Sequence, residues 1–173
     1  TGSISWPAWE MNYKEAMQPP REFAAHPKFE IIENGCARVA LKINRKNTKS
    51  YYTQIISLFK GSDRVGFYNE VDWRCTQSML KVVFPLTAEN EKARFDLGLG
   101  SIERGVSRPK LYEFPAQMWA HQEAKSGRYG TAVFSDSRTG WDKPDNKTLR
   151  LTVVHTPKGR YREESAQHLM DLG

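Results

Sequence analysis

Apolar and polar residues alternate with a period of two along most of the chain. Residues 37–43 show the pattern most clearly, because Ala37, Val39, Leu41 and Ile43 alternate with Arg38, Ala40 and Lys42. Strict alternation is typical of a strand with one buried face. Residues 29–33 predict a preceding strand, and the Asn34-Gly35 pair between the two segments is a strong hairpin signal.

Further segments with strand character follow at short intervals. Residues 79–86 are almost continuously apolar and end near Pro85, which favours a strand covered on both faces. The other predicted strands are residues 51–60, 65–71, 93–97, 99–103, 129–134 and 149–154. Residues 115–120 predict one helical turn that begins at a proline, and residues 163–172 fit either a helix or an irregular segment.

Strands dominate and no amphipathic helix exceeds two turns, so we predict an all-β fold, an antiparallel β-sandwich of two packed sheets. We expect residues 1–173 to form a single β-sandwich domain, with residues 1–20 as an irregular N-terminal segment rich in tryptophan and proline. Both ends have the character of a piece cut from a longer protein.

Charge and composition narrow the function classes. The net charge of +6 indicates weak attraction to polyanions. The basic residues are scattered and no nucleic-acid-binding motif accompanies them, so we expect no nucleic-acid partner. No apolar run approaches the roughly 20 residues that span a bilayer, so we expect no membrane partner. Cys36 and Cys75 lack metal-binding spacing and fit two free thiols.

Signatures of reactive sites are missing from the sequence. The four histidines His26, His121, His155 and His168 show neither H-x-H nor HExxH spacing, so we expect no metal site. There is no G-x-S-x-G elbow, and Cys75 has no histidine near it in sequence. The glycines of residues 98–105 lack the G-x-G-x-x-G spacing of a dinucleotide loop.

The stretch AVFSDSRTGWD, residues 132–142, is the candidate for carboxylate chemistry. Asp136 and Asp142 can line one groove, and Trp141 can pack on a sugar face. An ordinary turn explains the same residues, because Asp136-Ser137 can open it and Gly140 permits the bend. On local grounds we favour the turn.

Five motifs in order resemble the C-terminal β-region of α-mannosidases of glycoside hydrolase family 38. They are VDWRCTQSMLKVVFPL, ARFDLGLGSIERG, YEFPAQMWA, YGTAVFSDSRTGWD and NKTLRLTVVHTP. The resemblance covers roughly residues 9–173 and favours the bacterial type over the animal type. It implies a part of a galactose-mutarotase-like supersandwich.

The resemblance implies a function for the longer enzyme and a different one for this chain. The family is zinc-dependent and hydrolyses terminal α-mannosidic bonds with retention, in mannose metabolism. Its zinc ligands and nucleophile lie in an N-terminal (β/α) domain and the helical segment after it, and their motifs do not occur here. We therefore expect no catalytic residue and no metal ligand in this chain, and a fragment that is inactive alone.

The expected partners are the catalytic (β/α) domain of the same polypeptide and mannose-containing glycans, in the cytoplasm. The resemblance places four residues near the substrate, as part of the wall of the mannose site: Asp136, Trp141, Asp142 and Asp171. Ser137 and Arg138 depart from the usual family residues, which weakens detailed sugar contacts at this loop.

Two other function classes stay open. An independent carbohydrate-binding module could use tryptophans as stacking platforms, although we favour core or interface packing for most of them; they are Trp6, Trp9, Trp73, Trp119 and Trp141. A basic nucleic-acid binder is the third hypothesis. A fragment should also expose an apolar patch, to which Trp6, Trp9, Met11 and Met17 can contribute.

Overall fold

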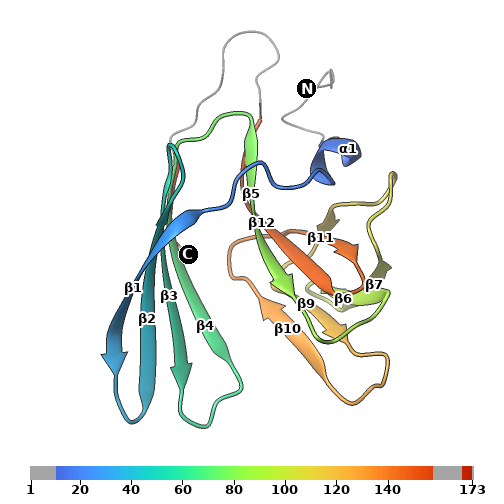
Figure 1. The fold of residues 1–173 in the computed structure, drawn as a ribbon. Coiled ribbons are helices and arrows are strands. Elements are labelled where there is room, and N and C mark those ends of the chain that lie inside the picture. The colour runs from blue at the N-terminus through green and yellow to red at the C-terminus, as the bar shows by residue number, and fades with distance from the viewer. Residues whose placement is uncertain (1–10, 158–168, 173) are drawn as a thin grey trace. The chain divides into compact units, whose positions relative to one another are not determined.

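Three antiparallel sheets make up almost all of the regular structure (Figure 1). The computed structural model describes residues 11–157 and 169–172. The chain divides into two compact units, Thr1–Gln18 with Gln77–Glu163 and Pro19–Thr76 with Glu164–Gly173. We call them the sandwich unit and the meander unit, and each is described by itself.

The sandwich unit contains two four-stranded sheets. One has the order β10-β9-β6-β7, formed by Gly130–Phe134, Trp119–Glu123, Lys92–Asp96 and Ser101–Gly105. The other has the order β5-β12-β11-β8, formed by Ser78–Pro85, Thr148–Thr156, Gly140–Asp145 and Phe114–Pro115. One helical turn, α1 (Tyr13–Ala16), precedes them, and Asn12 caps it by accepting a hydrogen bond from the Lys14 amide.

The core of the sandwich unit is built from alternate residues of both sheets. Phe95 on β6 meets Phe114 on β8 with ring centroids 5.1 Å apart in an edge-to-face arrangement. The other members of this cluster are Ala93, Ala116, Ala120, Trp141, Leu149 and Leu151. Two sheets that share one apolar layer are a β-sandwich, so the predicted all-β, antiparallel class is confirmed.

The meander unit is a single five-stranded sheet of order β1-β2-β3-β4-β13. Its strands are Ala25–Asn34, Arg38–Lys46, Tyr51–Phe59, Val65–Trp73 and Leu169–Leu172. The predicted hairpin at Asn34-Gly35 joins β1 to β2. Between β3 and β4 the chain turns at Gly61, whose φ of +73° is easily reached without a side chain.

Three sequence predictions of local structure differ from the structure. Residues 115–120 form no helical turn, because Pro115 ends the short strand β8 and Trp119 begins β9. The supposed turn at residues 140–142 is the first half of strand β11. Leu169–Leu172 is a strand that pairs with β4, whereas residues 163–168 lie outside the described part of the chain.

Residues 1–20 were predicted to be irregular, but the helical turn α1 lies within them. The prediction of one domain over residues 1–173 stays a prediction, because a division by internal contacts does not measure cooperative unfolding. No helix among the described residues is long and apolar enough to cross a membrane.

We predict that Phe95→Ala lowers the free energy of unfolding by roughly 3–5 kcal/mol, because it leaves a cavity in the shared apolar layer. Phe134→Ala is the matched control, since Phe134 lies in the same sheet but is 66% exposed, whereas Phe95 is fully buried. Urea unfolding of both variants measures the difference. Equal losses would contradict the placement of the core.

Candidate functional site

Charged residues collect on the face of sheet β5-β12-β11-β8 that points away from the apolar core. The register pairs Lys81 with Thr152 and Asp142 with Arg150, so these four side chains share one face. Their neighbours Val82, Leu151 and Trp141 point to the opposite, core-facing side. We call this charged surface the polar face of the sandwich unit.

Asp142 on β11 is the centre of the polar face. Its side chain is fully buried and accepts hydrogen bonds from Arg150 Nε at 2.6 Å and Nη2 at 3.0 Å. Lys81 Nζ donates to the same carboxylate at 2.6 Å. The bidentate contact with Arg150 and the second cation, Lys81, together supply the counter-charge that a buried carboxylate requires.

Glu113, just before β8, joins the same network. It accepts hydrogen bonds from Lys81 Nζ at 2.8 Å and from Thr152 Oγ1 at 2.6 Å. Gly140 makes room for it, since a Cβ built there would lie 2.8 Å from Glu113 Oε1. Lys81 therefore bridges two carboxylates, and its own side chain is only 10% exposed.

His155 reaches the polar face because strand β12 contains an irregularity. The register shifts between Thr152 and Val154, which turns Val154 into the core and places His155 opposite Met79. Burial lowers the pKa of His155; the charge of Glu113 opposes this effect and that of Lys81 adds to it. The neutral imidazole is thus the favoured form near neutral pH.

The N-terminal segment lies against the same network. Arg150 Nη2 donates to the Ala16 carbonyl oxygen at 3.3 Å. Tyr112 donates its hydroxyl hydrogen to the Met11 carbonyl oxygen, and its ring lies 5.4 Å from that of Tyr13. These contacts tie α1 and its flanks to the sandwich unit from more than 100 positions away in sequence.

The arrangement is suited to holding strands together and poorly suited to acid-base chemistry or metal binding. The carboxylates of Asp142 and Glu113 are already bound to cationic or hydroxyl donors. A zinc ion would have to displace Lys81 and Arg150, so these residues do not fit that metal. Across the described residues, no group of three or more His, Cys, Asp and Glu side chains is placed to hold a metal ion.

A second buried cation lies in the same unit, on β11. Lys143 is fully buried and its ammonium donates to the Gln122 side-chain oxygen and to the Asp145 carbonyl oxygen, the latter at 2.9 Å. Neither of these acceptors is a carboxylate oxygen. Burial therefore lowers the pKa of Lys143 to about 8, and the charge of Asp145 offsets only part of this effect.

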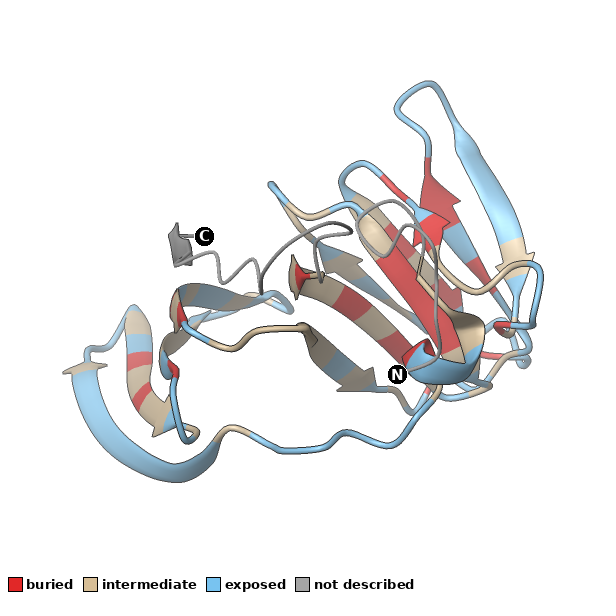
Figure 2. Ribbon diagram, turned by 90° about the horizontal axis from the view of Figure 1, so that it is seen from above, coloured by how far each residue is buried: buried red, intermediate tan, exposed pale blue. Residues whose placement is uncertain are grey.

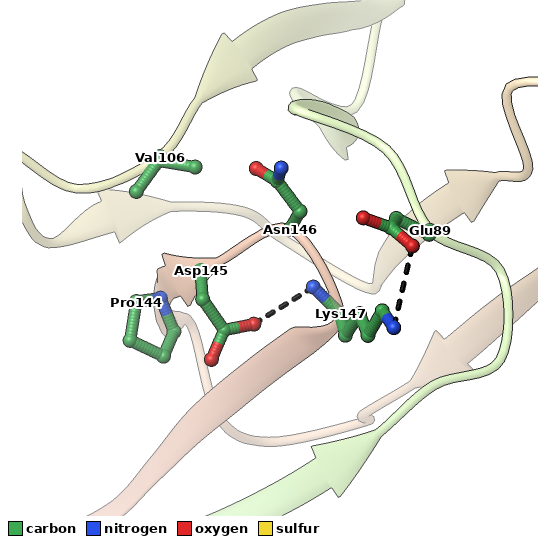
Figure 3. A pocket seen from close by; sticks show the side chains of 6 residues that line it. All are labelled: Glu89, Val106, Pro144, Asp145, Asn146 and Lys147. Carbon is green, nitrogen blue, oxygen red and sulfur yellow. Dashed lines mark hydrogen bonds and ion pairs between the residues drawn. The ribbon is translucent and has the colours of Figure 1, made fainter.

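A surface cavity of about 490 Å³ lies beside the β11–β12 hairpin (Figure 3). It is lined by Glu89, Val106, Pro144, Asp145, Asn146 and Lys147. Two of the charged groups pair, since Lys147 Nζ is 3.3 Å from Glu89. The Asp145 carboxylate accepts hydrogen bonds from the Lys147 amide and the Thr148 hydroxyl, which closes the hairpin turn.

Comparison with known proteins places this architecture in a family. Residues 2–159 match the family model described as the glycosyl hydrolases family 38 C-terminal domain. The chain belongs to this family. The match includes the two sheets of the sandwich unit and all members of the polar face named above.

Two relatives illustrate how much of a longer protein the match represents. Alpha-mannosidase G of Dictyostelium discoideum is 24% identical over 163 residues, which is 90% of this chain and 15% of that protein. A solved structure of a protein in glycosyl hydrolase family 38 from Enterococcus faecalis has a TM-score of 0.66 at 12% identity, over 75% of this chain and 19% of that one. The chain therefore spans less than a fifth of either relative.

In the folded chain, the four residues that the sequence predicted to lie near the substrate are found in different places. Trp141 and Asp142 are adjacent on β11 but occupy opposite faces, Trp141 in the apolar core and Asp142 in the ion network. Asp136 is exposed at the bend after β10. Asp171 lies on β13 opposite Val71, in the other unit. Their nearness to a sugar stays a prediction.

Burial decides the role of two of the candidate tryptophans. Trp141 and Trp73 are buried, so neither is an open stacking platform, whereas Trp119 is half-buried. Trp6 and Trp9 lie outside the described residues. The contacts of Trp141 agree with the preference for core packing.

Sequence reasoning missed the partners of Asp142. Lys81 carried a usable signal, because it is the one charged residue within the apolar run of residues 79–86, and buried charges are normally paired. Arg150 and Thr152 were expected only as the solvent-facing side of a strand. Glu113 had no signal, since it precedes a strand of two residues.

We predict that Asp142→Asn lowers the free energy of unfolding by roughly 3–5 kcal/mol, because it leaves two largely buried cations short of a counter-charge. Asp136→Asn, an exposed change of the same kind, should alter it by about 0.5 kcal/mol or less. Adding Lys81→Met to Asp142→Asn should recover part of the loss. Equal unfolding midpoints for the two single variants would contradict the structural role of Asp142.

Lys143 should make stability depend on alkaline pH. The unfolded chain keeps this proton up to the ordinary lysine pKa of 10.5, whereas the folded chain releases it near pH 8. Between these values the unfolded state binds more protons, so the stability of the native protein should rise with pH relative to Lys143→Met. Urea midpoints at pH 7 to 10 measure it.

The control for this pH experiment is Lys147→Met, because the Lys147 side chain is 63% exposed. Its stability difference from the native protein should stay constant over the same pH range. A constant difference for Lys143→Met as well would contradict a buried, easily deprotonated Lys143.

Proposed function

We propose that the chain is a non-catalytic β-region of a zinc-dependent, retaining α-mannosidase, in which it packs on the catalytic domain and forms part of the wall around the sugar. The observation that carries this proposal is the saturated ion network of Asp142. A carboxylate that compensates Arg150 and Lys81 supports strand architecture and is not available as a nucleophile or a general acid.

The comparisons also support a non-catalytic role for this chain within a longer enzyme. The family match is to a C-terminal domain, and over four fifths of each relative lies outside the matched part. The groups that cleave the glycosidic bond and hold zinc would belong to that remainder. The partner of this chain would then be the catalytic domain of the same polypeptide, and the substrate a mannose-containing glycan.

Within this proposal, the chain contributes enclosure rather than chemistry. A wall excludes water from a reactive centre and strengthens the electrostatic interactions inside it. The side chain of Asp136 is exposed, whereas those of Trp141 and Asp142 are buried, so of these three Asp136 is the best placed to meet a sugar or the catalytic domain directly. The cytoplasm remains the proposed location.

We predict that the 173-residue chain alone releases no mannose from an aryl α-mannoside, with or without added zinc. The longer polypeptide that contains it should release mannose, and a zinc chelator should abolish that activity. Chromophore release measures both. Turnover by the 173-residue chain would contradict a non-catalytic role, and an inactive longer polypeptide would contradict the mannosidase assignment.

A binding experiment separates this function from that of an independent carbohydrate-binding module. Calorimetric titration of the 173-residue chain with mannobiose should give no heat of binding at millimolar sugar, because Trp73 and Trp141 are buried. Saturable binding would favour the module instead.

A further inference from the structure

Residues 11–17 are held on the sandwich unit by groups that come from far away in sequence. We call this segment the strap, and it contains the single helical turn α1. At one end of the strap, the Tyr112 hydroxyl donates to the Met11 carbonyl oxygen. At the other end, Arg150 Nη2 donates to the Ala16 carbonyl oxygen at 3.3 Å. The strap is therefore bonded at both ends to the sandwich unit.

The helical turn of the strap is too short to form by itself. It has four residues, Tyr13–Ala16, whereas an isolated helix in water needs roughly 12–15 residues to be even marginally stable. Asn12 caps the turn, but a cap alone does not offset the cost of nucleating a helix. The turn and its contacts with the sandwich unit must therefore form together.

Few groups hold the strap in place. Among residues 11–17 only Ala16 is buried, and the others are intermediate or exposed (Figure 2). The ring of Tyr13 adds one aromatic contact, 5.4 Å from that of Tyr112. Segments with little buried surface open at a lower free energy than core strands do. We therefore expect the strap to open while the strands of the sandwich unit stay folded.

Arg150 connects the strap to the ion network of Asp142. Its Nη2 atom donates to Asp142 Oδ2 at 3.0 Å as well as to Ala16, with a weaker contact to Met17 Sδ at 3.8 Å. Ala16 is the last residue of α1, where carbonyl groups have no donor within the helix, and an arginine can supply it. Because Asp142 orients the guanidinium, the network and the docked strap stabilise each other.

We propose that the strap docks and releases as one unit, and that its docking holds Arg150 in its contact with Asp142. This coupling lies within the sandwich unit and is independent of the proposed function. By linkage, a change that releases the strap weakens the network to the same extent that loss of the network weakens the docking of the strap. A change at the N-terminal segment therefore reaches strands β11 and β12.

Hydrogen exchange in the 173-residue chain, followed by NMR, tests the coupling from both sides. The amides of Ala16 and Met17 donate hydrogen bonds inside the turn, so their protection reports the docked strap. The Nε proton of Arg150 donates to Asp142 and reports the network. The amides of strand β6 report global unfolding. The Gly127 amide, which is hydrogen-bonded in the turn between β9 and β10, is the internal reference.

The strap amides should exchange at least about tenfold faster than those of β6, because they open locally. Tyr112→Phe removes only the hydroxyl that binds Met11, and it should speed their exchange roughly two- to tenfold, the factor expected for one hydrogen bond. Tyr129→Phe is the matched control, since the Tyr129 hydroxyl donates to the Thr87 carbonyl oxygen at 3.0 Å. It should leave the strap amides unchanged.

The coupling itself is measured at the group that each variant does not touch. Asp142→Asn should speed exchange at the strap amides, with the Gly127 amide unchanged. In the reverse direction, Tyr112→Phe and the cap variant Asn12→Ala should each speed exchange of the Arg150 Nε proton. The reverse measurement decides the matter if Asp142→Asn does not fold.

Three outcomes would overturn the proposal. An unchanged rate at Arg150 Nε in both strap variants means that the strap and the network are not linked. Strap amides that exchange only as slowly as those of β6 mean that the strap opens only with the whole unit. Equal acceleration at Gly127 means that the variants loosen the sandwich unit in general.

Discussion

A carboxylate that is shut away from water must be compensated inside the protein, and Asp142 is compensated by two cations from neighbouring strands. Arg150 holds β12 to β11, and Lys81 extends the link to β5 and to Glu113. Removing Asp142 leaves both cations short of a counter-charge, so the network favours one strand register. The core on the reverse side of this sheet depends on the same register, because a slip by one residue would exchange Trp141 with Asp142.

The two faces of a strand explain why the chain has sites of such different character. In the sandwich unit, one face of sheet β5-β12-β11-β8 carries the aromatic core and the other carries the ion network. In the meander unit the same alternation places Leu41 and Ile56 on one side of the sheet and Lys42 and Thr53 on the other.

Much of the fold was predictable because its strands are regular. The alternation around Val39 and Leu41 and the Asn34-Gly35 turn predicted β1 and β2, and the motif order predicted the family that the comparisons then showed. Strand β11 was missed because residues 142–145, Asp-Lys-Pro-Asp, have the composition of a turn. The polar groups of Asp142 and Lys143 are buried only because Arg150, Lys81 and Gln122 bind them.

The sequence by itself determined the periodicity of the strands, the fold class and the family, because these depend on local alternation and on motif order. Only the tertiary structure decided what the charged residues do. It divided the predicted group, placing Trp141 in the core, Asp142 in an ion network, Asp136 at the surface and Asp171 in the other unit. The physical reason is that the role of a charge depends on its burial and its partners, and both arise from segments far apart in the chain.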